Sequence, residues 1–258
     1  MKKKHTIHIN HEACIGCGLC QKDCPAGNIL VKNQKAKIIT QECIMCGHCV
    51  AICPKAAVSM TGFDEPPKEI EKPTVLDPPT LLEAIRTRRS IRRFTKKQVE
   101  PEVLAQIIEA GRLTPTGGNA QDVSFIVLKD QIGRFEKPAV KLFRRLIPVM
   151  KLVNPMAGRV AIDDHFFFKG APAAIVIVSR SQINASLAAA NMELMVEACG
   201  LGVLYSGFFA MAANGSRSLK KMLGLKRGEK VVTTLVLGYP GVKYHRTAQK
   251  EAVSVRWF

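Results

Sequence analysis

The sequence reads Cys14-Ile-Gly-Cys17-Gly-Leu-Cys20-Gln-Lys-Asp-Cys24-Pro25 in one stretch and Cys43-Ile-Met-Cys46-Gly-His-Cys49-Val-Ala-Ile-Cys53-Pro54 in a second. Both stretches follow the spacing C-x2-C-x2-C-x3-C-P, and they contain eight of the nine cysteines in the chain. A loop with a cysteine at every third residue can hold three corners of an iron–sulfur cubane, whereas the fourth thiolate must come from elsewhere. The doubled pattern therefore predicts two [4Fe-4S] clusters and the transfer of single electrons.

The expected ligands follow from the same spacing, because the last cysteine of each run crosses over to the other cluster. By that rule one cluster takes Cys14, Cys17, Cys20 and Cys53, and the other takes Cys43, Cys46, Cys49 and Cys24. Gly16, Gly18 and Gly47 let the loop backbone approach the sulfides closely. The alternative is a pair of zinc sites, which also use Cys-x2-Cys pairs but need no third regularly spaced cysteine.

Residues 1–60 resemble a small bacterial ferredoxin domain. Alternating residues predict short strands at Lys4–Asn10 and Lys35–Thr40, and single helical turns are expected at 25–30 and 54–60. The ninth cysteine, Cys199, lies in a helical stretch rich in Ala and Met, where packing in the core is its expected role.

Composition narrows the class of protein. The chain has 258 residues, 47% hydrophobic and 23% charged, which suits one or two globular domains. The longest apolar run, Ala171–Val178, is too short to span a bilayer, so we expect a cytoplasmic protein without a membrane partner. The net charge of +17 would attract polyanions, but the clusters offset part of it and no nucleic-acid motif accompanies it, so no nucleic-acid partner is expected.

The pattern changes after a stiff linker at residues 61–80, which contains five prolines. Beyond it, helices and strands alternate through residues 81–258. Helices are predicted at Leu81–Arg88, Pro101–Gly111 and Asn184–Cys199, and central strands at Val123–Leu128, Ala173–Ser179 and Val231–Gly238. The helix at Asn184–Cys199 is apolar nearly all round, which predicts burial on every side, at the domain centre or at a dimer interface. No G-x-G-x-x-G or P-loop occurs, so the sequence predicts no dedicated nicotinamide domain.

Three segments of this region carry a resemblance. They are Arg88-Arg89-Ser90-Ile91-Arg92-Arg93-Phe94, Thr114-Pro115-Thr116-Gly117-Gly118-Asn119-Ala120-Gln121, and Leu237-Gly238-Tyr239-Pro240 with the basic tail 243–250. In this order they are similar to the flavin-dependent nitroreductase family over residues 80–258. The whole chain resembles ferredoxin–nitroreductase fusions of anaerobic microbes. The resemblance implies an α+β protein in which a ferredoxin-like domain precedes an α/β sandwich with a central mixed sheet flanked by helices.

The resemblance also implies a set of FMN contacts. Arg88, Arg89 and Ser90 would hold the FMN phosphate, and their guanidinium forks suit a dianion. Arg92 would reach the flavin pyrimidine edge and stabilise the negative charge that reduction builds near N1. The remaining implied FMN contacts are Thr116, Asn119, Ser206 and Gly207, the last two through backbone amides, while Gly118 would lie near the substrate.

The chain departs from the family in two places. Where relatives usually close an arginine on the phosphate, Lys250 is the best match and Arg246 a nearby substitute. Many relatives have Pro-Trp where this chain has Asp122-Val123, which affects the expected shape of the substrate pocket. Read without its companion motifs, the arginine run is an ordinary solvated end of a helix.

Residues 133–170 are the variable region that forms the substrate channel in the family. Phe135, Phe143 and Phe166-Phe167-Phe168 lie here, and such a cluster more often belongs to the core. His165 is interpreted as a structural histidine rather than as a proton donor.

The predicted protein is a homodimeric oxidoreductase that passes electrons from two [4Fe-4S] clusters to FMN and on to a small organic acceptor, such as a nitroaromatic or a quinone. An external ferredoxin or NAD(P)H is the expected electron source. The alternatives are a non-catalytic electron carrier and a redox sensor, each with a protein partner. No catalytic acid–base residue is assigned, because water or substrate can supply the proton.

Overall fold

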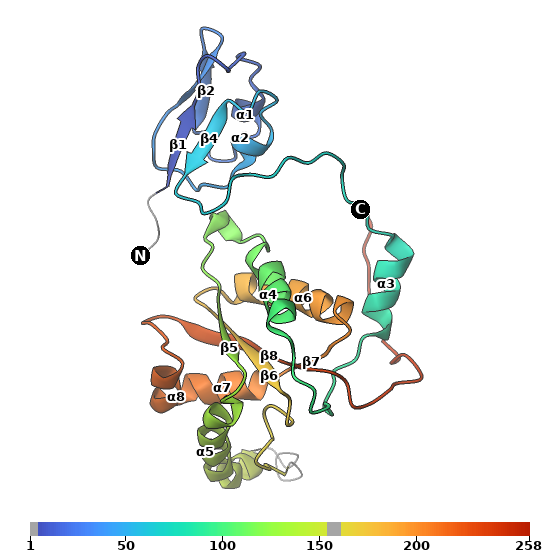
Figure 1. Ribbon diagram of the computed structural model, residues 1–258. Helices are drawn as coiled ribbons and strands as arrows, with labels where there is room; N and C mark the ends of the chain where they lie inside the picture. The colour runs from blue at the N-terminus through green and yellow to red at the C-terminus, as the bar shows by residue number, and fades with distance from the viewer. Residues whose placement is uncertain (1–4, 154–160) are drawn as a thin grey trace. The chain divides into compact units, whose positions relative to one another are not determined.

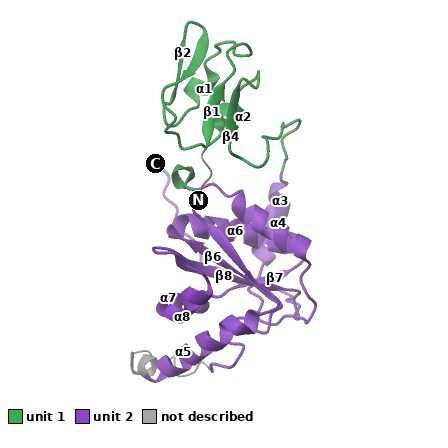
Figure 2. Ribbon diagram, turned by 60° about the vertical axis from the view of Figure 1, so that its left-hand side comes forward, with its two compact units in different colours: residues 1–75, 117–120 green, residues 76–116, 121–258 purple. Residues whose placement is uncertain are grey.

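The computed structural model describes residues 5–153 and 161–258 and divides into two compact units (Figure 2). Unit 1 comprises Met1–Val75 with Gly117–Ala120, and unit 2 comprises Leu76–Thr116 with Gln121–Phe258. Lys4, the start of the first predicted strand, lies outside the described residues. Among the described residues, no helix combines the length and the apolar character that a membrane span requires.

Unit 1 contains two antiparallel strand pairs and two short helices (Figure 1). Strand β1 (Thr6–Ile9) pairs with β4 (Val58–Thr61), and β2 (Ile29–Lys32) pairs with β3 (Lys35–Ile38). The helices are α1 (Leu19–Lys22) and α2 (His48–Ala51). Ile7, Ile29 and Val58 are buried together with Cys14, Cys20 and Cys49, so the hydrophobic core of this unit includes cysteines.

The predicted helical turns at 25–30 and 54–60 are wrong. Turns at these positions lead directly into β2 and β4, and the short helices lie earlier, beginning after Gly18 and Gly47. The cause is local: the backbone N–H groups of Asn28 and Ala57 donate to the Sγ atoms of Cys24 and Cys53, both at 3.3 Å. A backbone that points its amides at sulfur in this way leaves the helical hydrogen-bond pattern.

Unit 2 is built on a four-stranded sheet with the order β5-β6-β8-β7. The strands are β5 (Ser124–Leu128), β6 (Ala173–Ser179), β7 (Gly202–Tyr205) and β8 (Lys230–Gly238), and neighbours pair antiparallel. An isolated bridge between Ser90 and Val203 adds a parallel pairing, which makes the sheet mixed. β6 is buried along its whole length, as its apolar run predicts, whereas β5 lies at an edge of the sheet rather than at its centre.

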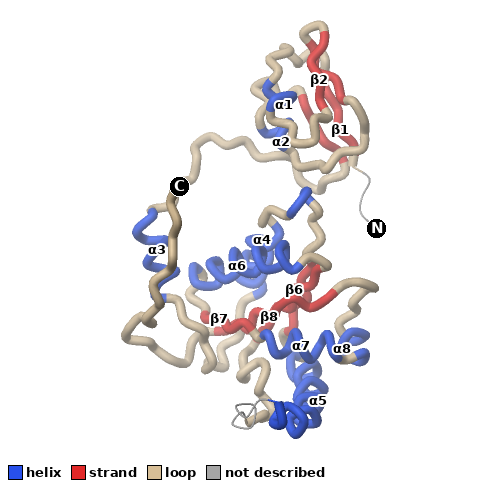
Figure 3. Tube along the Cα trace, turned by 180° about the vertical axis from the view of Figure 1, so that it is seen from behind, coloured by secondary structure: helices blue, strands red, loops and turns tan. Residues whose placement is uncertain are grey.

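Helices cover both faces of this sheet (Figure 3). One face carries α4 (Pro101–Arg112) and α6 (Gln182–Ala198), and the other carries α5 (Ile132–Val153), α7 (Gly207–Gly215) and α8 (Arg217–Met222). Outside these layers are α3 (Pro78–Thr87), which begins within the predicted linker, and a short 3-10 turn, η1 (Gly117–Asn119), which groups with unit 1. A Cβ at Gly111 would meet Met192 Sδ at 2.7 Å, so this glycine allows α4 to approach α6 closely.

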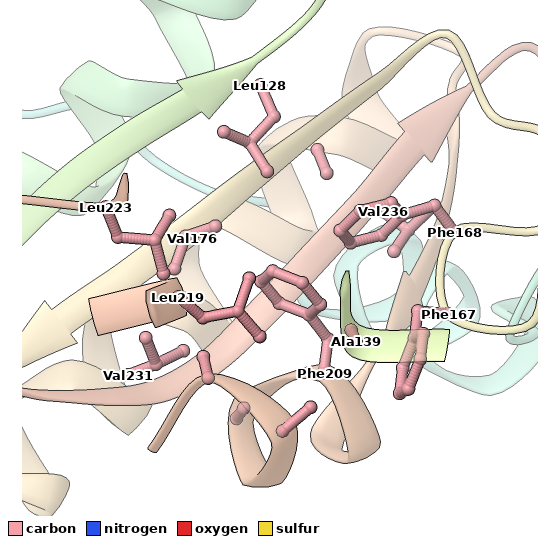
Figure 4. Close-up of a cluster of buried hydrophobic side chains, with 14 of the residues drawn as sticks. Leu128, Ala139, Phe167, Phe168, Val176, Phe209, Leu219, Leu223, Val231 and Val236 are labelled. Carbon is pink, nitrogen blue, oxygen red and sulfur yellow. The ribbon is translucent and has the colours of Figure 1, made fainter. Parts of the chain in front are cut away.

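The two faces have separate cores. Phe167, Phe168 and Phe209 lie between the sheet and the helices α5, α7 and α8 (Figure 4). Phe143 packs edge-on against Phe167, with ring centroids 5.0 Å apart. The structure therefore places the central residues of the phenylalanine cluster in the core, which was the favoured interpretation of that segment.

Helix α6 differs from its prediction. Its inner face, including Ala185, Ala189 and Met192, is fully buried against the sheet and α4. Ile183 and Leu187 are nevertheless 73% and 48% exposed. Burial on every side is thus wrong for the single chain, because neither α4 nor the sheet covers the outer face of this helix.

Candidate cluster and flavin sites

Unit 1 brings the eight cysteines of the two runs together in two sets of four. One hollow is lined by Cys14, Cys17, Cys20 and Cys53, and the other by Cys24, Cys43, Cys46 and Cys49. These are the two sets that the crossover rule predicts. The third cysteine of each run lies in a short helix, α1 or α2, and the fourth follows after three residues and lines the other hollow. We refer to the hollows as site I, with Cys14, and site II, with Cys43.

Backbone amides surround the thiols of both sites. The N–H of Met45 donates to Cys43 Sγ at 3.4 Å, and that of Ala36 donates to Cys14 Sγ at 3.4 Å, in addition to the bonds from Asn28 and Ala57. Such N–H···S bonds stabilise the negative charge of a cluster with its thiolates. The donor set therefore fits an iron–sulfur group.

The pKa values of the buried thiols also fit an iron–sulfur group. Burial raises the pKa of Cys20, and it raises the pKa of Cys49 to about 11, with the other three thiols of each site adding to the increase. The amides of Ala36 and Gly16, with Lys35 nearby, lower the pKa of Cys14. Four crowded thiolates are costly unless a positively charged centre holds them, and iron supplies that charge.

In unit 2, the first predicted FMN residue is engaged within the protein. The guanidinium of Arg88 donates to the carboxylate of Glu193 on α6 and forms an ion pair with it. The hydroxyl of Tyr205 lies 3.3 Å from Glu193 Oε2 and 3.1 Å from the carbonyl oxygen of Ala189. Burial raises the pKa of Glu193 while Arg88 lowers it, and burial also raises the pKa of Tyr205.

The rest of the arginine segment is attached to the edge of the sheet. Ser90 bridges to Val203 on β7, and the N–H of Ile91 donates to the carbonyl of Val203 at 2.9 Å. Arg89 lies over the ring of Tyr244, 5.8 Å from its centroid, and Arg92 is exposed. Strand pairing thus fixes the backbone of this segment, while the side chains of Arg89 and Arg92 extend from it.

Ser206 and Gly207 begin α7 directly after β7. The N–H of Ser206 donates to the carbonyl of Thr234 at 2.8 Å, so this amide is used within the sheet, and the expected contact of Ser206 with the flavin stays a prediction. Gly207 occupies the first helical position, where an amide has no partner within its own helix, and a Cβ built on it would meet no atom within 4 Å outside its chain neighbours and its own helix backbone. Of these two residues, Gly207 is the one whose backbone amide has room for a flat ring such as that of a flavin.

The remaining predicted residues have contacts within the protein or lie in the exposed C-terminal tail. The hydroxyl of Thr116 accepts from the N–H of Gln121 at 3.0 Å. Asn119 belongs to unit 1, where its Nδ2 donates to the carbonyls of Ile44 and Met45 at 2.9 and 2.8 Å. Arg246 and Lys250 are both exposed in the C-terminal tail. The set of FMN contacts therefore stays a prediction.

Sequence reasoning missed two features of unit 2. Glu193 is the buried partner of Arg88, and its signal was a carboxylate within a helix that is otherwise apolar nearly all round. A cavity of about 590 Å³ lies beside α5, and its lining includes Lys137, Lys141 and His165. His165 Nδ1 lies 3.7 Å from Glu136 Oε2, which fits the structural role that the sequence suggested for this histidine.

Similarity to known proteins covers both units. The model of a 4Fe-4S dicluster domain matches residues 6–54, and the model of the Nitroreductase family matches residues 85–239. A protein of Archaeoglobus fulgidus, provisionally named NADH dehydrogenase/NAD(P)H nitroreductase, is 25% identical over 62% of this chain and 84% of its own length.

Solved structures show the same fold for unit 2. A nitroreductase with bound FMN from Bacteroides fragilis has a TM-score of 0.57 and 19% identity, over 68% of this chain and 98% of that one. An FMN-dependent nitroreductase from Clostridium difficile has a TM-score of 0.56 with the same identity and coverage. Because the family model spans more than half of the residues, this chain belongs to the nitroreductase family and carries a 4Fe-4S dicluster domain before its nitroreductase domain.

Proposed function

We propose that this chain is an iron–sulfur flavoprotein oxidoreductase, in which electrons pass from two [4Fe-4S] clusters to FMN and on to a small organic acceptor. The observation that carries the proposal is the occurrence, in one chain, of two four-cysteine hollows and a nitroreductase domain. Nitroaromatics and quinones are the first acceptors to test, because the fold alone does not select a substrate.

The cysteines of sites I and II would hold the clusters, which supply one-electron transfer when bound. The peptide amides of Ala36, Met45, Asn28 and Ala57 then neutralise part of the negative charge on the thiolates. FMN, when bound, supplies the exchange between single electrons and a hydride equivalent. The protein contributes position and charge at both places.

The flavin contacts are proposed from the family pattern and the geometry of unit 2. Arg88, Arg89 and Ser90 would orient the phosphate, with Arg246 or Lys250 closing on it. Arg92 would stabilise negative charge at the pyrimidine edge, and the amide of Gly207 would face the ring. Thr116 and Asn119 remain proposed contacts.

A homodimer is part of the proposal. The outer face of α6 exposes Ile183 and Leu187, and α7 exposes Phe208 and Met211, at 52% and 58%. Ile183 and Leu187 are four residues apart and therefore neighbours on the surface of α6, and contiguous exposed apolar side chains mark interaction sites, so we assign the dimer interface to this face of α6. Substitution of Ile183 by Glu should lower the mass that light scattering measures from dimer to monomer, whereas an unchanged mass would contradict this interface.

The test of the function is anaerobic purification with iron, acid-labile sulfide and flavin measured per chain. We expect about eight irons and about one FMN per chain, and stepwise addition of a reductant should reduce both the iron–sulfur clusters and FMN. Protein without flavin would contradict the enzyme proposal and favour a redox sensor. Flavin without turnover of any small acceptor would favour an electron carrier.

Two neighbouring arginines provide a matched pair for the flavin contact. Arg92→Gln should lower the flavin reduction potential and weaken FMN binding, because a cation near N1 favours the reduced, negatively charged ring. Arg93→Gln removes the same charge from the adjacent exposed position and should leave both quantities near the wild-type values. Equal effects of the two substitutions would contradict the role of Arg92.

A further inference from the structure

The two halves of the dicluster domain correspond residue by residue. A shift of 29 positions takes Cys14 to Cys43 and Cys24 to Cys53, and it takes β1 to β3 and β2 to β4. Gly18 and Gly47, which are equivalent under this shift, have φ angles of 78° and 79°. Each residue around site I can therefore be compared directly with its counterpart around site II.

Most hydrogen bonds to sulfur have a counterpart. The bond from Asn28 N–H to Cys24 in site II matches the bond from Ala57 N–H to Cys53 in site I, and both are 3.3 Å long. Amides of Gly16 and Met45 contact Cys14 and Cys43 in the same way. Where these contacts are matched, the two sites offer a cluster the same stabilisation.

The correspondence fails at one amide. The N–H of Ala36 donates to Cys14 Sγ at 3.4 Å. The counterpart of Ala36 is Ile7, whose N–H instead donates to the side-chain oxygen of Gln41 at 3.3 Å. Gln41 thus takes up the amide that would otherwise face Cys43, so site I has a donor that site II lacks at the equivalent position.

The two halves also differ in one charged residue, Lys35, which lies beside site I. The ammonium of Lys35 donates to the carbonyl oxygens of Cys14 and His11, both at 2.7 Å, and its side chain is half-buried. The counterpart of Lys35 is Thr6, a neutral residue whose hydroxyl bonds to Thr61 and His8. The charge of a half-buried cation is screened by salt less than that of an exposed one. The ammonium of Lys35 is such a cation, and it lies at site I.

From these two differences we propose that the cluster of site I has a higher reduction potential than the cluster of site II, with Lys35 as the residue that sets much of the difference. One electron from a one-electron reductant adds one negative charge to a cluster, and a nearby N–H dipole and cation favour that added charge. The first electron to enter the oxidised domain therefore resides at site I. This inference rests on the proposed clusters.

The test is a redox titration of the intact, anaerobically purified protein, followed by EPR. Wild-type protein should show two separate cluster potentials. Lys35→Thr installs the neutral residue found at the equivalent position and should lower the upper potential by roughly 59 mV, a tenfold change in the one-electron equilibrium, while the lower potential stays in place. Lys37→Thr removes an exposed cation from the same strand and should shift neither potential by a comparable amount.

A second variant keeps the proposal falsifiable if Lys35→Thr impairs folding. Thr6→Lys places a cation at the equivalent position of site II and should raise the lower potential, which narrows the gap. Equal potentials in the wild type, or no selective shift in either variant, would overturn the proposal. Iron and sulfide counts well below eight per chain would instead show that the two-cluster premise fails, and absence of flavin alone would leave this inference intact.

Discussion

The guanidinium of Arg88, at the end of α3, is paired with the carboxylate of Glu193 on α6, although the two residues lie 105 positions apart in the sequence. The Glu193 side chain is 12% exposed and that of Arg88 is 30% exposed. Removal of one partner from such a pair leaves a largely buried charge without compensation, which is more costly than the pair itself is stabilising.

Arg88→Ala should therefore lower the free energy of unfolding by about 2–4 kcal/mol, somewhat less than for a fully buried pair. Arg86→Ala is the matched control, because Arg86 pairs with Glu83 on the surface, and it should change stability by less than about 1 kcal/mol. Denaturant unfolding measures both. Addition of Glu193→Gln to Arg88→Ala should restore part of the loss, and strict additivity would contradict the coupling.

The residues that sequence analysis located well are those whose chemistry depends on local spacing. The cysteine runs specify their own loops, so the two sets of four could be predicted from the pattern and the crossover rule. The run Ala173–Ser179 could be recognised as a buried strand because its seven residues are apolar or small. The Arg88–Glu193 pair has no such local signal, since it forms only when α3 and α6 are assembled.

The errors have similar physical causes. The segments after Cys24 and Cys53 suggested helical turns, but sulfur competes there for the backbone amides. β5 was expected at the centre of the sheet because an apolar run does not distinguish an edge strand from a central one. The partner of the Ser206 amide also lies far away in the sequence, since β8 accepts it through Thr234, and a contact of Ser206 with flavin stays a prediction. In each case the tertiary partner of a backbone group decided the outcome.

Gly16 and Met45 occupy equivalent positions of the two halves but differ in whether a side chain fits there. Gly16 has a φ angle of +67°, and a Cβ there would collide with the backbone carbonyl of Gln34. Met45 has a φ angle of 53° and already carries a side chain. Gly16→Ala should lower the melting temperature and the iron content of the anaerobically purified protein, because backbone must move, whereas Met45→Gly should change stability by no more than about 1 kcal/mol. Similar losses in both variants would contradict this asymmetry.

Glu136 should make stability depend on pH. Burial raises the pKa of this carboxyl above its usual 4.5, although the N–H groups of Phe168 and Phe167 partly oppose the increase. The folded protein therefore favours the protonated form of Glu136. The contribution of this group to the free energy of unfolding is fully present at low pH, and it is lost as the pH rises from about 4.5 through the raised pKa. Near neutral pH, Glu136→Gln should unfold at a higher denaturant concentration than the wild type, and the difference should shrink in acid.

Asp164→Asn is the control for that measurement. Asp164 lines the same cavity and pairs with Arg144, but its side chain is 80% exposed. Its substitution by Asn removes an exposed ion pair and should change stability by less than about 1 kcal/mol. A Glu136→Gln curve parallel to that of the wild type would show that this carboxyl does not titrate differently in the folded state.

Pairs of cysteine substitutions can test the crossed ligand sets directly. Site II contains both Cys24 and Cys43, whereas Cys14 belongs to site I. Cys24→Ala should remove about four irons, and adding Cys43→Ala should remove no more, because both thiols serve one cluster. Adding Cys14→Ala to Cys24→Ala should instead remove nearly all the iron. Cys199→Ala, which lies in neither site, should leave the iron content unchanged. If Cys14 and Cys24 behaved as ligands of one cluster, the crossed arrangement would be wrong, and each run would hold its own four irons.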